Sequence, residues 1–276
     1  MTGAALKVVH DADAAPPRDI AWLAETIRQN RFLPMPPEDR MFVGDGDYRA
    51  IGAEFLRHFV EIGGLRRDAH VLDIGCGTGR LAVPLTQYLD PQRGAYDGVD
   101  PVRWGIDWCA ANITPHYPAF RFQHLDVRHA IYNPEGHLDG SASILPIESG
   151  AIDFAAMVSV VTHLPATEVR RYAHKVERVL VPGGTLLLTT FTLDRDGPPK
   201  SGDPRLKFTR LAEGEPEWVA DRANPTGAVG FDDGFIEEVA SAAGMTVRRK
   251  SLGSWSGRTA PHYQDIFVIE KNRSGR

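Results

Sequence analysis

The stretch Val71-Leu72-Asp73-Ile74-Gly75-Cys76-Gly77-Thr78-Gly79-Arg80 joins an apolar run to three alternate glycines. The apolar part predicts a buried strand, and residues 81–89 predict the helix that follows it. Glycine lets the backbone approach a ligand closely, and a helix start offers free N–H groups and a positive dipole end. The spacing is GxGxG, whereas the dinucleotide pattern GxGxxG needs a glycine where Arg80 stands. The stretch therefore indicates a nucleotide-type ligand and disfavours NAD without excluding it.

Short apolar runs alternate with helical periodicity along the rest of the chain. We expect strands at 70–74, 95–100, 120–125, 152–161, 185–192, 246–252 and 266–270, and helices at 19–30, 81–89, 102–113, 168–180 and 235–243, with one more that begins at Tyr48 and stops at Gly63-Gly64. Strands that alternate with helices of this length imply a mostly parallel sheet covered on both faces. The predicted fold class is therefore α/β.

The length of 276 residues allows one decorated domain or two small ones. We expect an N-terminal cap or lid at 1–47 and a main domain at 48–276, with insertions at 128–150 and 195–230. The second insertion is rich in Pro and Gly, with short β-like pieces around Phe208 and Trp218. Loops of this length are usually functional covers or disordered.

Composition narrows the classes of partner. The net charge is −5, which gives the whole molecule no attraction to nucleic acid. The two cysteines, Cys76 and Cys109, indicate neither a disulfide framework nor a zinc site. No signal peptide and no apolar run long enough to span a membrane is apparent. We expect a cytoplasmic monomer or homodimer that binds neither nucleic acid nor membrane.

Two predicted strands end in a carboxylate. Asp100 closes the strand 95–100, where it is well placed to accept hydrogen bonds from two ribose hydroxyls. Asp126 follows the next strand and is placed to accept one from an adenine amino group. Ligands of open α/β sheets bind at these carboxyl ends of the strands.

These motifs make residues 48–192 resemble the class I S-adenosylmethionine-dependent methyltransferases, with weaker similarity to residue 271. The segment 160–164 is similar to the exit of the family's fourth strand beside the transferable methyl group, and 179–184 to the turn before its fifth strand. The resemblance implies a Rossmann-like fold with a mostly parallel seven-stranded sheet, and S-adenosylmethionine as cofactor. The connection from Asp126 to Leu145-Pro146 is longer than in the common pattern, which leaves the residues that flank the adenine undetermined. The cofactor-binding residues that the resemblance implies are Asp73, Gly75, Cys76, Gly77, Gly79, Asp100, Pro101, Asp126, Val127 and Ser159.

Three residues are candidates for catalysis. His163 stands at the expected methyl-facing edge, where an imidazole is suited to deprotonate a hydroxyl near neutral pH. The alternative is that His163 only braces its loop. His262 and Tyr263, close to Asp265, form a second cluster. Cys76 is expected to pack as a small apolar residue rather than to act as a nucleophile.

The acceptor that we favour is a hydroxyl of a sugar or another small polar metabolite, for example a mannose- or rhamnose-type saccharide. The accessory segments are acidic and carry Tyr and Trp, and residues 253–258 and 263–265 resemble a bacterial subgroup of small-molecule methyltransferases. Transfer to nitrogen or carbon, an NAD-dependent oxidoreductase and a module that only binds the cofactor stay open. No metal motif is present, although the acidic pair Asp232-Asp233, which we expect to cap the last helix, leaves a divalent cation open.

Overall fold

The computed structural model of the chain describes residues 19–42, 44, 46–139, 144–194, 197 and 202–273. The remaining residues of the predicted N-terminal cap and of the two predicted insertions lie outside this described part.

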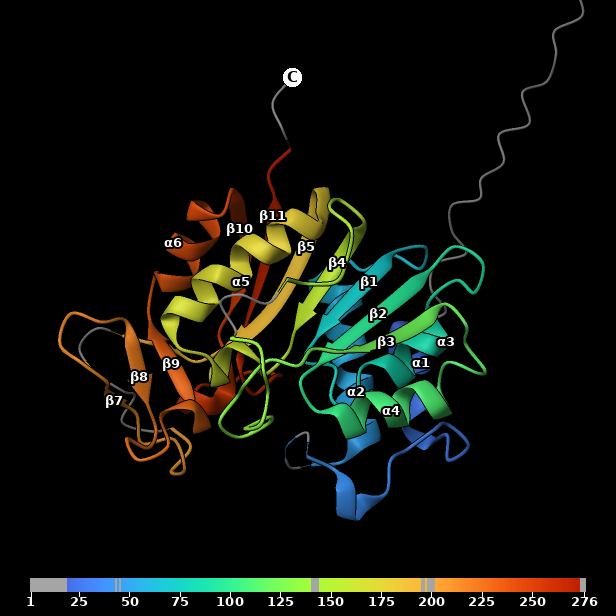
Figure 1. The fold of residues 1–276 in the computed structure, drawn as a ribbon, viewed down its shortest axis with the longest axis horizontal. Helices are drawn as coiled ribbons and strands as arrows, with labels where there is room; N and C mark the ends of the chain where they lie inside the picture. Colours follow the sequence, from blue (N-terminus) through green and yellow to red (C-terminus); the bar gives the residue numbers. More distant parts are fainter. Residues whose placement is uncertain are drawn as a thin grey trace, which may run out of the picture.

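Seven strands form the central sheet (Figure 1). Their order is β3 (Phe120–His124), β2 (Ala95–Asp100), β1 (His70–Ile74), β4 (Ile152–Met157), β5 (Leu180–Thr190), β11 (Asp265–Lys271) and β10 (Met245–Ser251). All neighbours are parallel except β11, which runs antiparallel to both β5 and β10. The predicted α/β class and the mostly parallel seven-stranded sheet are confirmed.

The helices cover both faces of the sheet because side chains alternate along each strand. Leu72 and Ile74 of β1 pack in a core cluster with α5 (Ala166–Val179) and α6 (Phe235–Ala242). Val71 packs on the opposite face, in the cluster that holds the remaining helices, α1 (Ile20–Gln29), α2 (Tyr48–Arg57), α3 (Ala82–Tyr88) and α4 (Arg103–Asn112). In Figure 1, α5 lies in front of the sheet with α6 beside it.

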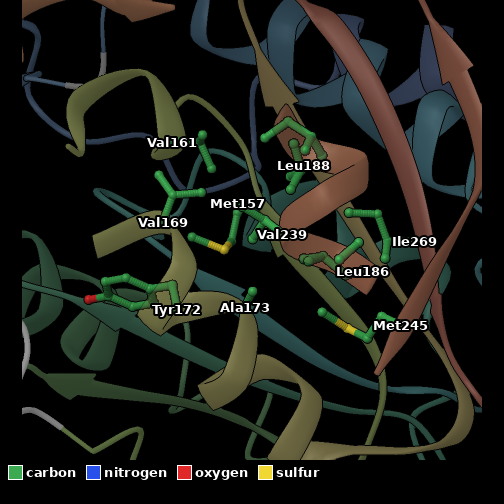
Figure 2. Close-up of a pocket in the computed structure, with 12 residues that line it drawn as sticks. Met157, Val161, Val169, Tyr172, Ala173, Leu186, Leu188, Val239, Met245 and Ile269 are labelled. Carbon is green, nitrogen blue, oxygen red and sulfur yellow. The ribbon is translucent and has the colours of Figure 1, made fainter. Parts of the chain in front are cut away.

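The core beneath α5 is closely packed. Figure 2 shows Met157, Val161 and Val169 gathered between this helix and the sheet, while the hydroxyl of Tyr172 points away from them. The void that remains there is about 20 Å³, room for no more than a water-sized molecule, and its lining is apolar. Ligands must therefore bind elsewhere.

Several element boundaries differ from the prediction. The strand β4 stops at Met157, and residues Val161–His163 form a 3₁₀ turn instead of continuing it. The strand β5 begins at Leu180, and Pro182-Gly183-Gly184 is an excursion within it, because four residues of β5 lie opposite one residue of β4. Gly183 takes a φ of +82°, which glycine tolerates without strain.

The connection from β3 to β4 contains no helix in its described part, residues 125–139 and 144–151. Two short bridges, Val127 with Leu138 and His129 with Asn133, fold it back on itself. Its apolar residues Leu125, Val127 and Leu145 join the core on the α5 side. An irregular segment thus lies at the carboxyl end of β3.

The second predicted insertion contributes to a separate four-stranded sheet. Its strands, in spatial order, are β6 (Thr192–Leu193), β9 (Val229–Asp232), β8 (Glu217–Val219) and β7 (Thr209–Arg210). Trp218 and Phe208 are buried in its own apolar cluster, as their β-like surroundings in the sequence indicated. The expected cap of α6 by Asp232-Asp233 is wrong, since the capping residue is Gly234 and Asp232 binds Arg210 and the indole N–H of Trp218.

Part of the predicted N-terminal cap packs in the core of the domain. The helix α1 buries Ile20, Ala24 and Ile27 in the core cluster of α2 and α3, because these residues recur on one helical face. Asp19 accepts the N–H of Ala21 and caps the helix. This part of the segment belongs to the core of the domain.

We expect Ile27→Ala to lower the free energy of unfolding by about 2 to 5 kcal/mol, because it removes a buried side chain from that core. Trp22→Ala, on the face of α1 where the indole is 54% exposed, is the matched control and should change stability little. Urea denaturation measures both. An unchanged midpoint for Ile27→Ala would mean that α1 is a detachable lid.

Candidate active site

A cleft of about 710 Å³ opens where the parallel strands end. The strand register brings Ile74, Val99 and Gln123 level, so the ends of β1, β2 and β3 meet at one edge, where α/β sheets bind ligands. The predicted site residues that line the cleft are Gly75, Cys76, Gly77, Asp100, Pro101, Val127, Ser159, His163, His262 and Tyr263.

The glycine loop is anchored to the end of β2. Gly75 and Gly77 have φ angles of +81° and +55°, a region that favours glycine. The N–H of Gly77 donates to Oδ2 of Asp100 at 2.8 Å, and the N–H of Val102 donates to Oδ1 at 2.7 Å. Burial raises the pKa of the Asp100 carboxyl to about 6. The loop and the carboxylate therefore form one rigid edge of the cleft.

Three predicted cofactor residues do not line the cleft. Asp73 is buried, and the hydroxyl of Tyr96 donates to its Oδ2 at 2.6 Å, while no described residue bonds its Oδ1. Burial raises the pKa of Asp73 to about 7. Gly79 packs against α4, where an added Cβ would lie 3.0 Å from Sγ of Cys109.

Asp126 is the third of these residues. Its carboxylate accepts from His137 Nδ1 at 2.7 Å and from the Asn133 amide at 3.3 Å. The hydrogen bonds from His137 and Asn133 lower the pKa of Asp126. The irregular segment after β3 thus engages this carboxylate itself.

His163 is held in one tautomer. Its Nδ1 lies 2.9 Å from the carbonyl oxygen of Thr226, which only accepts, so the proton is on Nδ1. The Nε2 atom carries the lone pair and lies 3.3 Å from the hydroxyl of Tyr132. Burial lowers the pKa of His163, which keeps the ring neutral near pH 7. An imidazole in this state is ready to accept a proton.

A second histidine, His129, also joins the segment of Tyr132 to His163. His129 donates from Nε2 to the carbonyl of His163 at 3.0 Å, and its Nδ1 accepts the N–H of Ile131 at 3.2 Å. Burial raises the pKa of the Tyr132 hydroxyl, so it stays a donor. The irregular segment and the 3₁₀ turn are therefore linked next to the base candidate.

The second predicted cluster consists of His262, Tyr263 and Asp265, and its side chains differ in what they contact. The hydroxyl of Tyr263 donates to Asp203 at 2.6 Å, and burial together with this bond raises the pKa of Tyr263 to about 12. Asp265 is fully buried and accepts the N–H groups of Thr192 and Gly253. His262 is 4% exposed and lines the cleft. Of the three side chains, Asp265 supports the backbone and His262 faces the ligand space.

Sequence reasoning missed several residues of the cleft, and the reason is that they reach it through tertiary contacts. Gln264 is the neighbour of the predicted Tyr263 but was not itself predicted. The sequence around Tyr132 contains no motif that would mark it as a site residue. Arg80 was considered only as the residue that breaks the dinucleotide pattern. Polar and aromatic cleft residues outside the predicted site residues are Phe42, Glu54, Phe55, Arg80, Arg128, His129, Tyr132, Thr162, Glu168, Tyr172, Thr189, Phe191, Arg205 and Gln264.

No group of three or more His, Cys, Asp or Glu side chains in the described ranges is arranged to hold a metal ion. The helices of the described part are all too short or too polar to cross a membrane.

Comparisons with known proteins identify the family. Residues 47–247 match a family described as a methyltransferase domain. The fold is similar to that of a SAM-dependent methyltransferase from Methanosarcina mazei, with 18% identity, a TM-score of 0.51, and coverage of 78% of this chain and 98% of that chain.

Two further solved structures share the fold. The amino pentose methyltransferase CalS10 from Micromonospora echinaspora, solved with SAM bound, has 16% identity and a TM-score of 0.51 over 82% of this chain and 92% of its own. The cyclase SpnF has 18% identity and a TM-score of 0.55 over 84% of this chain and 86% of its own. The chain therefore belongs to the methyltransferase-domain family, and it is a class I S-adenosylmethionine-dependent methyltransferase, with S-adenosylmethionine as its cofactor.

Proposed function

We propose that this methyltransferase transfers the methyl group to a hydroxyl of a small polar acceptor, a saccharide or glycoside, with His163 as the general base. The observation that carries the proposal is the fixed tautomer of His163, a residue of the cleft lining whose Nε2 is unprotonated.

The cleft suits the cofactor on its glycine-loop side. The Asp100 carboxylate, with both oxygens fixed by backbone N–H groups, would accept from the ribose hydroxyls, and Gly75 and Gly77 leave room for the methionine part. Pro101, Val127, Cys76 and Ser159 complete this side of the lining. When bound, the cofactor supplies a methyl group on an electrophilic sulfonium.

An alcohol is a weak nucleophile while it is protonated. Nε2 of His163 would take the hydroxyl proton as the oxygen attacks, and the bond from Nδ1–H to Thr226 would stabilise the imidazolium that forms. The Tyr132 hydroxyl, at 3.3 Å, is at the long end for a hydrogen bond, so an acceptor hydroxyl can take its place. Alignment of the two reactants in the cleft supplies much of the remaining acceleration.

The other side of the cleft favours a polyhydroxylated acceptor. Carboxylate, imidazole and amide groups stand among aromatic rings there, which is the mixture that binds sugar hydroxyls and sugar faces. The groups concerned are Glu54, His129, Glu168, His262 and Gln264, with Phe55, Tyr132, Tyr172, Phe191 and Tyr263. The amino pentose methyltransferase among the similar folds acts on a compound of the same class.

A panel of glycosides, amines and phenols, assayed for incorporation of labelled methyl groups, tests this function. Transfer to glycosides supports it, and transfer to amines alone would assign N-methylation instead. Tight binding of S-adenosylhomocysteine without transfer to any acceptor would favour a cofactor-binding module.

We expect His163→Gln to lower kcat by about 10²- to 10⁴-fold, because the variant lacks the base. In the wild type, kcat/KM should be on its plateau at neutral pH and fall as the pH drops below the ordinary histidine value, since protonated His163 accepts no proton. The variant should keep its thermal shift with S-adenosylhomocysteine. Unchanged turnover in His163→Gln would reduce His163 to a brace for its loop.

Cofactor affinity should depend on pH through Asp100. Its pKa is raised to about 6, so protonation below that value removes the ionised acceptor for the ribose hydroxyls. We expect the affinity for S-adenosylhomocysteine to fall as the pH drops through about 6, and Asp100→Asn to bind more weakly with no such dependence. Isothermal titration from about pH 5 to about pH 8 measures both. A pH-dependence retained in Asp100→Asn would assign it to another group.

A further inference from the structure

The segment before β11 places His262 and Gln264 together in the acceptor side of the cleft. They flank Tyr263 in a bend before the strand, and Tyr263 donates its hydroxyl to Asp203. Neither His262 nor Gln264 is needed for the base or for the cofactor contacts described above. Their remaining hydrogen-bonding capacity therefore indicates a further task.

The backbone of this segment is fixed by the stretch 253–255. The N–H of Ser254 donates to the carbonyl of His262 at 2.9 Å, and the N–H of Trp255 donates to that of Tyr263 at 3.0 Å. The two segments approach closely. A Cβ at residue 253 would lie 2.1 Å from the Tyr263 carbonyl oxygen, so only glycine fits there. Residues 262–264 are thereby held in one place.

One ring nitrogen of His262 has a hydrogen-bond partner, and the other has none among the described residues. Nε2 lies 2.9 Å from the hydroxyl oxygen of Ser251. Nδ1 is buried and no described residue bonds it, although His262 lines the cleft and is only 4% exposed. A buried polar atom without a partner is costly, so a ligand group that reaches Nδ1 would gain by bonding to it.

The amide of Gln264 is oriented by two hydroxyl groups. The Thr189 hydroxyl accepts the N–H of Ser159 at 2.8 Å, so its own proton goes to Oε1 of Gln264 at 2.5 Å. The Ser159 hydroxyl also donates to Oε1, at 3.0 Å. With the amide oxygen saturated, the Nε2 group keeps its two N–H donors, for which no described residue serves as acceptor.

The backbone of Ser159, which takes part in these hydrogen bonds, has a strained conformation. Its φ angle is +57°, and it is the only non-glycine residue with positive φ in the described part of the chain. Such a conformation persists where the surroundings impose it, and it is frequent at functional sites. Here the imposed conformation lets the N–H of Ser159 donate to the Thr189 hydroxyl and its own hydroxyl donate to Oε1 of Gln264.

We propose that His262 and Gln264 form a two-point subsite that holds a second oxygen-bearing group of the acceptor, apart from the hydroxyl that receives the methyl group. The inference deepens the proposed function and rests on it. Gln264 donates N–H groups, and Nδ1 of His262 adds one donor or acceptor. The subsite selects polyols, such as saccharides, over molecules with a single hydroxyl.

The test compares two methyl acceptors, methyl α-D-mannopyranoside and cyclohexanol. The first variant is Gln264→Glu, which keeps an oxygen acceptor for both hydroxyls and replaces the N–H donors with a second carboxylate oxygen. The second is His262→Phe, which keeps a ring beside His58 and removes Nδ1 together with the Nε2 contact to Ser251. Gln92→Leu, at an exposed site on the loop before β2, is the control.

We expect either variant to lower kcat/KM for the mannoside at least tenfold, mainly through KM, and to leave kcat/KM for cyclohexanol unchanged. His163→Gln should instead lower kcat for both acceptors. Equal losses on both acceptors, or no loss on the mannoside, would overturn the subsite. The thermal shift with S-adenosylhomocysteine confirms that each variant is folded.

Titration of the mannoside into the complex with S-adenosylhomocysteine separates this inference from the proposed function. Binding by the wild type that both variants lose supports the subsite even if no methyl group is transferred, in which case only the proposed function fails. Equal binding by wild type and variants overturns the subsite. A wild type that methylates cyclohexanol but neither binds nor methylates the mannoside overturns it as well.

Discussion

The hydrogen bonds from Gly77 and Val102 to the Asp100 carboxylate are the contacts on which the glycine-loop edge of the cleft depends. They join the loop after β1 to the end of β2, and the N–H groups of Gly75 and Cys76 strengthen the junction through the carbonyl of Val99. Because both carboxylate oxygens already have partners, the group stays ordered despite its burial. The Asp100 side chain and the Val99 carbonyl together hold the glycine loop at the end of β2.

Local sequence patterns predicted most of the fold. The apolar runs of β1, β2 and β11 and the helical periodicity of α5 place the sheet and its covering layer, since burial on both faces leaves a strong signal in sequence. The same patterns failed where backbone geometry depends on tertiary contacts. The end of β4 at Met157 and the capping of α6 by Gly234 are two such places.

The site was predictable only in part. Asp100 is the last residue of β2, and His163 lies shortly after β4, so both could be predicted from the sequence. The orientation of Gln264 depends on Thr189, which lies 75 residues earlier, and the tautomer of His163 depends on Thr226, which lies 63 residues later. Asp126 is turned to His137 because the connection after β3 is irregular in its described part. Such pairings leave no trace in local spacing.

The group that orients His163 is a backbone carbonyl, and every amino acid offers the same atom at position 226. Substitution of the Thr226 side chain would therefore leave the orientation of the imidazole intact, whereas a shortened or displaced turn would remove it. Selection on this contact acts on the path of the chain rather than on the identity of a residue. The segment that carries it is free to vary in composition, and hence in the acceptor surface that it presents, as long as its length and course persist.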